Sequence, residues 1–191
     1  MERENHFLVV LKIGNYEKER AIAVFCRCVA TGIFGIGRKI PMNRVNDLGQ
    51  REGYWRDSVG GGFVYDLYYK GGKKDGLYKR FYRNKLFLFG EYTADNISGT
   101  WYMFGDEGEL RCTIDSIELN KDSIYTGYCR IFCKYKCYCA DYYPSGAVKS
   151  EGYMVCDEDF MVDFWEIGEW KYYDESGNLI KTKDYGDRRT P

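Results

Sequence analysis

Short runs of alternating aromatic and polar residues recur along the chain, each preceded by a glycine. Examples are REGYWRD, which contains Gly53 and Trp55, and KKDGLYKRFY, which contains Gly76 and Tyr78. Alternation with a period of two is typical of a β-strand that buries one face. A glycine before such a run provides positive φ where the chain turns or closely approaches its neighbour. The pattern therefore predicts many short β-hairpins.

These glycines recur at intervals of 23, 23, 28 and 41 residues, at Gly53, Gly76, Gly99, Gly127 and Gly168. Two positions after each glycine come Trp55, Tyr78, Trp101, Cys129 and Trp170. Recurrence on this scale indicates a repeat architecture. A unit of this length holds one hairpin, which is too small to be stable alone. We therefore expect the units to stack, with their aromatic residues in one continuous ladder.

The sequence predicts an all-β fold, an elongated array of stacked antiparallel hairpins. Residues 46–185 form the repeat domain in this interpretation, and residues 186–191 form a flexible tail. Residues 1–45 do not fit the repeat, so we expect an N-terminal cap or extra strands there. Gly60–Gly62 and Gly71–Gly76 are interpreted as hairpin turns, and Val155–Glu166 as an insertion that lies on a binding face.

The segments Asn46–Trp55, Tyr68–Tyr82, Tyr142–Tyr153 and Ile167–Tyr185 resemble MORN repeats. They are most similar to the bacterial variant in YwqK-type antitoxin-like proteins, whose units read roughly G-x-W-x-x-Y-Y, N-G-x-L and G-x-Y. The resemblance implies a sheet of stacked hairpins. It also implies an antitoxin or immunity-like role, although such repeats occur in proteins with unrelated functions.

The charge of the chain is nearly balanced, with 28 Lys and Arg against 29 Asp and Glu. This balance gives no electrostatic signature of a nucleic-acid partner or an anionic membrane. No uninterrupted apolar stretch reaches the roughly 18–20 residues of a membrane span. Ala21–Gly37, interrupted by Arg27, is either a pair of buried strands or a degenerate secretory signal. We expect a cytoplasmic protein, with export as the alternative.

Eight cysteines are present: Cys26, Cys28, Cys112, Cys129, Cys133, Cys137, Cys139 and Cys156. The cluster Cys129–Cys139 lacks the paired spacing of zinc motifs. Cysteines that follow one strand face form a line, which does not surround an ion. We expect reduced, packed thiols and neither metal nor cofactor, with disulfides or a metal site as alternatives.

No catalytic constellation can be assembled, because the one histidine, His6, lies near the N-terminus. We therefore expect a non-enzymatic protein-binding module. The acidic side chains of the insertion would suit a basic partner. The candidate partner-binding residues are these acidic side chains and several aromatic ones: Tyr65, Tyr69, Tyr82, Tyr143, Asp157, Glu158, Asp159 and Trp165. In the alternative interpretation, the second face of the sheet packs on the N-terminal segment.

Two other functions stay open: an exported or envelope-associated scaffold, and a binder of lipid headgroups or small molecules. A terminal strand of the array would also allow a homodimer through the sheet edge.

Overall fold

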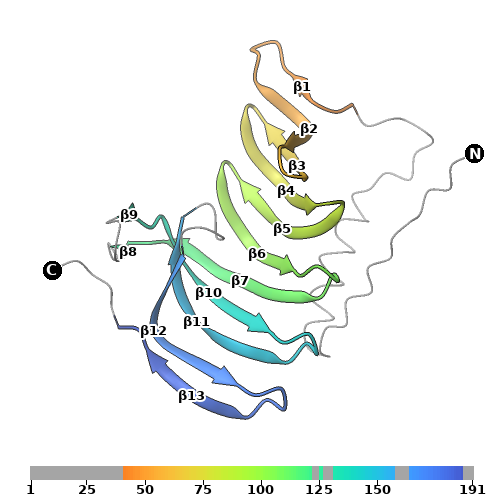
Figure 1. Cartoon of the computed structure of the whole chain (residues 1–191). Helices are drawn as coiled ribbons and strands as arrows, with labels where there is room; N and C mark the ends of the chain where they lie inside the picture. The colour runs from red at the N-terminus through yellow and green to blue at the C-terminus, as the bar shows by residue number, and fades with distance from the viewer. Residues whose placement is uncertain (1–40, 122–124, 127–130, 158–163, 187–191) are drawn as a thin grey trace, which may run out of the picture.

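The computed structural model of the chain describes residues 41–121, 125–126, 131–157 and 164–186, which form β-strands and connecting turns and contain no helix. Eleven strands form one open sheet and two form a small separate sheet (Figure 1). The all-β fold and the hairpin array are thereby confirmed. The described part of the chain contains no helix of the length and hydropathy that a membrane span requires. Gly127, Glu158, Asp159 and most of the expected cap and tail lie outside the described residues.

The strands of the large sheet follow one another in chain order, all antiparallel: β1 (Arg44–Val45), β2 (Arg51–Val59), β3 (Phe63–Lys70), β4 (Lys73–Tyr82), β5 (Lys85–Thr93), β6 (Asn96–Phe104), β7 (Leu110–Leu119), β10 (Tyr135–Tyr142), β11 (Val148–Cys156), β12 (Phe164–Tyr173) and β13 (Leu179–Asp184). Each strand thus pairs with the one before it and the one after it. This is the topology of a meander of hairpins.

The array is interrupted once, between β7 and β10. The strands β8 (Tyr125–Thr126) and β9 (Ile131–Phe132) form the small sheet there, while β7 pairs directly with β10. The fourth predicted repeat, built on Gly127, falls in this excursion, and its flanking strands stand outside the large sheet. The interval from Gly99 to Gly168 is long because it contains this extra hairpin.

The two ends of the predicted insertion Val155–Glu166 belong to strands of the array, and residues 158–163 lie outside the described residues. Val155 lies opposite Trp165 and Cys156 opposite Phe164, so the pairing of β11 with β12 extends to these residues. Val155 and Ile167 are buried together with Cys133 in a small second core, and Trp165 packs against it. The segment begins with Val155 and Cys156 and contains Phe164 and Trp165 near its other end. Because these residues are apolar, the two ends pair as strands and extend the hairpin.

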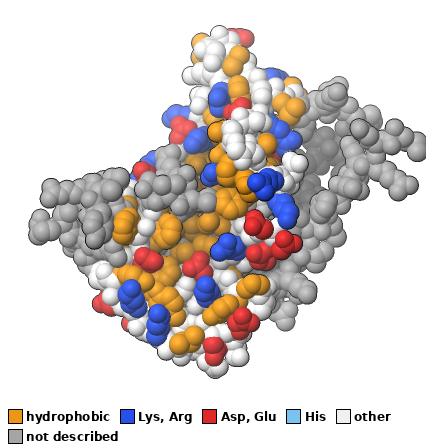
Figure 2. All heavy atoms as spheres, viewed as in Figure 1, with side chains coloured by type: hydrophobic (Ala, Val, Ile, Leu, Met, Phe, Trp, Pro, Cys, Tyr) orange, Lys and Arg blue, Asp and Glu red, His pale blue; other side chains and the backbone are white. Residues whose placement is uncertain are grey.

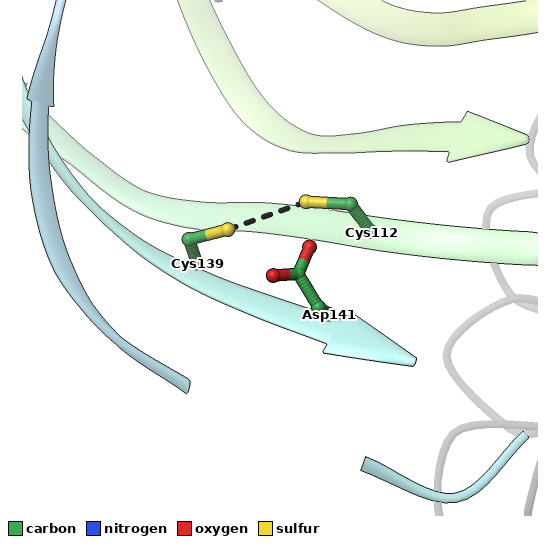
Figure 3. Close-up of side chains that lie close together, drawn as sticks. All are labelled: Cys112, Cys139 and Asp141. Atoms are coloured by element: carbon green, nitrogen blue, oxygen red, sulfur yellow. Dashed lines mark hydrogen bonds between the residues drawn. The ribbon is translucent and has the colours of Figure 1, made fainter. Parts of the chain in front are cut away.

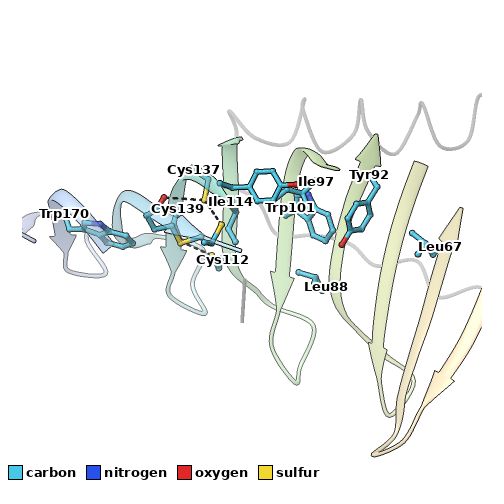
Figure 4. Packing of buried hydrophobic residues seen from close by; sticks show 13 residues of the cluster. Leu67, Leu88, Tyr92, Ile97, Trp101, Cys112, Ile114, Cys137, Cys139 and Trp170 are labelled. Atoms are coloured by element: carbon cyan, nitrogen blue, oxygen red, sulfur yellow. Dashed lines mark hydrogen bonds between the residues drawn. The ribbon is translucent and has the colours of Figure 1, made fainter. Parts of the chain in front are cut away.

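Strand pairing aligns the aromatic residues of successive hairpins in one row across the sheet. The row runs through Trp55, Leu67, Tyr78, Gly90, Trp101, Ile114, Cys139, Gly152 and Trp170. We call this row the apolar spine, and the face that carries it the spine face. Figure 4 shows five of its members, Leu67, Trp101, Ile114, Cys139 and Trp170, on successive parts of the sheet.

Close aromatic contacts hold the middle of the spine together. The ring centroids of Tyr78 and Trp101 are 5.5 Å apart, and Tyr92 lies 5.7 Å from the first and 5.2 Å from the second. Trp101 and Ile114 are each only 1% exposed. Such aromatic pairs add about 0.5–1.5 kcal/mol each beyond the burial of their area. The predicted ladder is present.

The glycines that precede the spine aromatics lie inside strands, at irregularities of the pairing. Gly53, Gly76, Gly99 and Gly168 all have positive φ, between 59° and 128°, as predicted. However, the turn before β4 consists of Gly71 and Gly72, and Gly76 lies within the strand. The register shifts opposite Gly76, Gly99 and Gly168, which is the signature of a β-bulge. These glycines therefore bend strands, whereas the hairpin turns use other residues.

Two further glycines, Gly90 and Gly152, provide the surface on which the spine tryptophans lie. A Cβ atom added to Gly90 would stand 2.2 Å from the ring of Trp101, and one on Gly152 would stand 2.5 Å from the ring of Trp170. Each ring therefore packs directly on the backbone of the preceding strand. Trp101 Nε1 donates to the carbonyl of Ser98 (3.1 Å), and Trp170 Nε1 to that of Tyr153 (2.7 Å).

We expect Gly90→Ala and Gly152→Ala each to lower the free energy of unfolding by about 1–3 kcal/mol, because the methyl group collides with a rigid indole ring. Gly60→Ala is the matched control, since its Cβ would meet no atom within 4 Å and its φ is not positive. Urea unfolding followed by tryptophan fluorescence measures the change. Equal losses in all three variants would contradict the packing described here.

Candidate functional site

The face opposite the spine carries a second continuous row of directly opposed residues. It crosses ten strands through Arg56, Asp66, Lys79, Phe89, Tyr102, Thr113, Ala140, Glu151, Lys171 and Thr182. Each of these residues is next in sequence to a residue of the spine row or its continuation, so alternation places it on the other face. The row carries both signs of charge.

Three directly opposed aromatic pairs lie on this second face. Their ring centroids are 5.1–6.0 Å apart: Tyr54–Tyr68, Phe89–Tyr102 and Tyr138–Tyr153. Tyr68 is 39% exposed and Tyr153 is 46% exposed, although both are large aromatic residues. We call this side of the sheet the tyrosine face. Figure 2 shows one side of the molecule, where hydrophobic side chains lie between charges of both signs.

A charged network fixes the β2–β3 end of the tyrosine face. The guanidinium of Arg56 donates two hydrogen bonds to the carboxylate of Asp66, at 2.6 and 2.7 Å. Burial, followed by a hydrogen bond with Asp66, raises the pKa of Tyr54 to about 12. The hydrogen bond from Arg56 to Asp66 also raises the pKa of the arginine. The Tyr54 hydroxyl is therefore held beside the ion pair.

A similar arrangement fixes the β10–β12 end. The hydroxyl of Tyr173 donates to Glu151 Oε1 at 2.7 Å. Burial, and then the negative charge of Glu151, raise the pKa of Tyr138 above its usual value. The ammonium of Lys136 lies 5.3 Å from the ring centroid of Tyr153, within cation–π range. Both ends of the face thus present aromatic rings held in place by charged neighbours.

The predicted binding tyrosines of β3 and β4 lie on the spine face. The ring centroids of Tyr65 and Tyr78 are 5.9 Å apart, and those of Tyr82 and Phe63 are 4.8 Å apart. Tyr69 packs against the core. These positions follow the same alternation as Leu67 and Tyr78, so their rings extend the core surface. They do not meet the aromatic pairs of the other face.

Of the other predicted binding residues, Trp165 lies on the tyrosine face, directly opposite Val155, which alternates with Tyr153 along β11. Tyr143 follows β10 and donates its hydroxyl to the carbonyl of Tyr173 at 2.9 Å. Trp165 packs against the small second core, and Asp157 directly follows β11 and is partly exposed. The residues that sequence reasoning did not select are Tyr54, Tyr68, Tyr102, Tyr138 and Tyr153. Their signal was available, because each is adjacent in the sequence to a residue of the spine.

A second candidate site lies on the spine face, where β7 meets β10. The carboxylate of Asp141 and the thiols of Cys112 and Cys139 place three ligand atoms within 4.8 Å of one another (Figure 3). The two sulfur atoms are 3.3 Å apart. Ser150 Oγ donates to Asp141 Oδ2 at 3.0 Å. All four residues line one cavity of about 370 Å³.

The thiol of Cys112 is poorly suited to nucleophilic catalysis. The hydrogen bond with Cys139 raises the pKa of Cys112, and burial and the nearby charge of Asp141 act in the same direction. The thiolate is the nucleophilic form of cysteine, and this environment favours the protonated thiol. A metal ion would reverse that preference, because thiolate is the form that binds it. The group is therefore a candidate ligand set.

A second thiol pair is close by but has different surroundings. Cys137 and Cys156 have their sulfur atoms 3.6 Å apart, and both residues are fully buried. No third ligand residue completes this pair among the described residues. Its environment is that of packed core thiols.

The Tyr54 pKa predicts how stability depends on alkaline pH. In the unfolded chain this tyrosine loses its proton near pH 10, whereas in the fold it does so near 12. The stabilisation that this shift adds to the free energy of unfolding is complete below about pH 10 and is lost as pH rises toward 12. The free energy of unfolding should thus fall more between about pH 10 and 12 in the wild type than in Tyr54→Phe. Urea titrations at each pH test this, and a pH-independent difference would contradict it.

No family model matches the chain, and no curated protein or solved structure matches it either. The resemblance to MORN repeats therefore stays a prediction from the residues.

Proposed function

We propose that this protein is a non-enzymatic protein-binding module whose partner docks on the tyrosine face. The observation that carries the proposal is the set of three opposed aromatic pairs on that face, with Tyr68 and Tyr153 exposed. Tyrosine offers a large, rigid contact area with few rotatable bonds and a polar tip. It is enriched at the energetic centres of protein interfaces for that reason.

The spacing of the aromatic pairs suits a macromolecule. Tyr68 on β3 and Tyr153 on β11 are separated by six strand intervals, which corresponds to about 28 Å at 4.7–4.9 Å for each interval. A single small ligand cannot contact both. A partner surface of standard size, about 800 Å² on each side, can.

The charges between the aromatic pairs provide a means of selecting the partner. Lys79, Glu151 and Lys171 lie in the same row as Phe89 and Tyr102. Charges on an interface favour partners of complementary pattern and disfavour others, and they contribute more to specificity than to affinity. The rigid pairs would supply affinity in this arrangement, and the charged row would supply selectivity.

We further propose that the partner is a toxin-like effector that this protein inhibits by covering its surface. Support comes from the resemblance of the repeat segments to antitoxin-like proteins. A rigid, preorganised sheet face also suits tight inhibition, because little conformational freedom is lost when it binds.

The first test locates the partner. A photo-crosslinking phenylalanine analogue is placed at Tyr68 or Tyr153, and at Leu48 as an exposed control outside the two faces. The product of a neighbouring gene is the first candidate to be mixed with the purified chain. We expect crosslinks to one protein from the two tyrosine-face positions and none from the control. Crosslinking from Leu48 alone would contradict the proposed surface.

With a partner in hand, Tyr68→Ala and Tyr153→Ala test the energetics. Each should weaken binding by about 2 kcal/mol, or roughly 30-fold in Kd, if these tyrosines act as interface hot spots. Leu48→Ala, at an exposed position in the turn before β2, is the control and should leave Kd unchanged. Isothermal titration calorimetry measures the three values. Unchanged Kd in both tyrosine variants would exclude the tyrosine face as the docking surface.

A further inference from the structure

We propose that Cys112, Cys139 and Asp141 form a binding site for one zinc ion at the junction of β7 and β10. This site lies on the spine face, so the proposal is independent of the partner surface described above. It rests on the ligand set, its geometry, its supporting residues and its access to solvent.

The ligand set matches the preferences of zinc. Zinc is bound by cysteine sulfur and by carboxylate oxygen, and thiolates select it over hard cations such as magnesium and calcium. The three donors come from two neighbouring strands, with Cys112 directly opposite Asp141 and Cys139 two positions before it. The donors therefore form a triangle. Sequence spacing predicted a line of sulfurs along one strand, because it could not show that Cys112 and Asp141 lie opposite each other.

The distances suit a tetrahedral ion. Two thiolates at the usual Zn–S distance of 2.3 Å are about 3.8 Å apart in a tetrahedral site. The sulfur atoms of Cys112 and Cys139 stand 3.3 Å apart, so a small rotation about their side-chain bonds reaches that value. Figure 3 shows the Asp141 carboxylate directed toward the two sulfur atoms.

Neighbouring residues support the three ligands. Ser150 donates a hydrogen bond to Asp141 Oδ2, which fixes the orientation of the carboxylate, as outer-shell partners do in metal sites. Two thiolates and one carboxylate around Zn²⁺ leave a net charge of −1. Lys149, which lines the same cavity, offers a compensating positive charge.

The cavity of about 370 Å³ gives the ion a path from solvent and leaves room for a fourth ligand. Three protein ligands with one further position are typical of zinc sites that keep a water molecule. The binding step is balanced by proton release. The thiols of Cys112 and Cys139 each lose one proton to the buffer as their sulfurs bind Zn²⁺.

The position of the site gives the ion a structural consequence. β7 and β10 are the one neighbouring pair of the large sheet that is separated in sequence by other described strands. An ion held by Cys112 from one strand and by Cys139 and Asp141 from the other would tie this junction together. Metal binding of this kind adds directly to folding stability.

The experiment uses the full chain, reduced and made metal-free, and titrated under argon with Co²⁺ as a spectroscopic probe. We expect thiolate-to-cobalt charge-transfer absorption that saturates at one equivalent and is displaced by Zn²⁺. Cys112→Ser and Cys139→Ser should each weaken Co²⁺ binding by about 100-fold or more. Ser150→Ala should weaken it by about 10-fold, as is typical for loss of an outer-shell partner.

Asp141→Asn keeps the shape of the side chain, so it separates loss of a ligand from loss of the fold, which circular dichroism monitors. It should also weaken Co²⁺ binding. Cys137→Ser is the matched control, because it alters a thiol pair that is also buried but lacks a carboxylate. A double Cys26→Ser, Cys28→Ser variant controls for binding elsewhere in the chain. Both controls should keep the affinity of the wild type.

Three results would overturn the proposal. One is the absence of charge-transfer absorption in the reduced chain. Another is that the charge-transfer absorption stays in Cys112→Ser and Cys139→Ser, which would place the ion elsewhere. The same conclusion would follow if the absorption disappeared in the double Cys26→Ser, Cys28→Ser variant. The last is a Cys112–Cys139 disulfide, found by peptide mass mapping after air oxidation, in a chain whose reduced form binds no metal.

Discussion

Large aromatic rings packed on strand backbone hold this sheet together. Trp101 lies on Gly90 and Trp170 lies on Gly152, at distances that leave no room for a Cβ atom. An isolated hairpin buries too little apolar surface to be stable, so each unit needs its neighbours. The spine meets this need by passing from strand to strand across the sheet, with Tyr78, Tyr92 and Trp101 in mutual contact.

The positive-φ glycines serve the same purpose indirectly. At Gly99 and Gly168 the strand bulges, and the extra residues bring the tryptophan two positions later onto the glycine of the preceding strand. A bulge also increases the local twist of the strand. The bulge and the tryptophan ring therefore act together. This explains why the distance from glycine to aromatic is kept while the length of the repeat varies.

The two faces of the sheet have different consequences because side chains alternate along every strand. The spine face holds the core and, at the β7–β10 junction, the cluster of Cys112, Cys139 and Asp141. The tyrosine face holds opposed aromatic pairs and the Arg56–Asp66 ion pair. Burying the spine rigidifies the strands, and rigid strands keep the opposite rings in fixed positions. Stability on one face thus preorganises the other.

Alternation and spacing determined the all-β fold, the hairpin array and the alignment of Trp55, Tyr78 and Trp101, because these depend on local periodicity and on burial. Only the tertiary structure decided which strands pair across the excursion of β8 and β9, since that depends on contacts distant in sequence. The same pairing placed Cys112 opposite Asp141. Alternation along β3 and β4 puts Tyr65, Tyr69 and Tyr82 on the side of Leu67 and Tyr78, and only the structure showed that this side is the core. Periodicity shows that a strand has two faces, but the neighbouring strands decide which face becomes the core and which side chains meet across it.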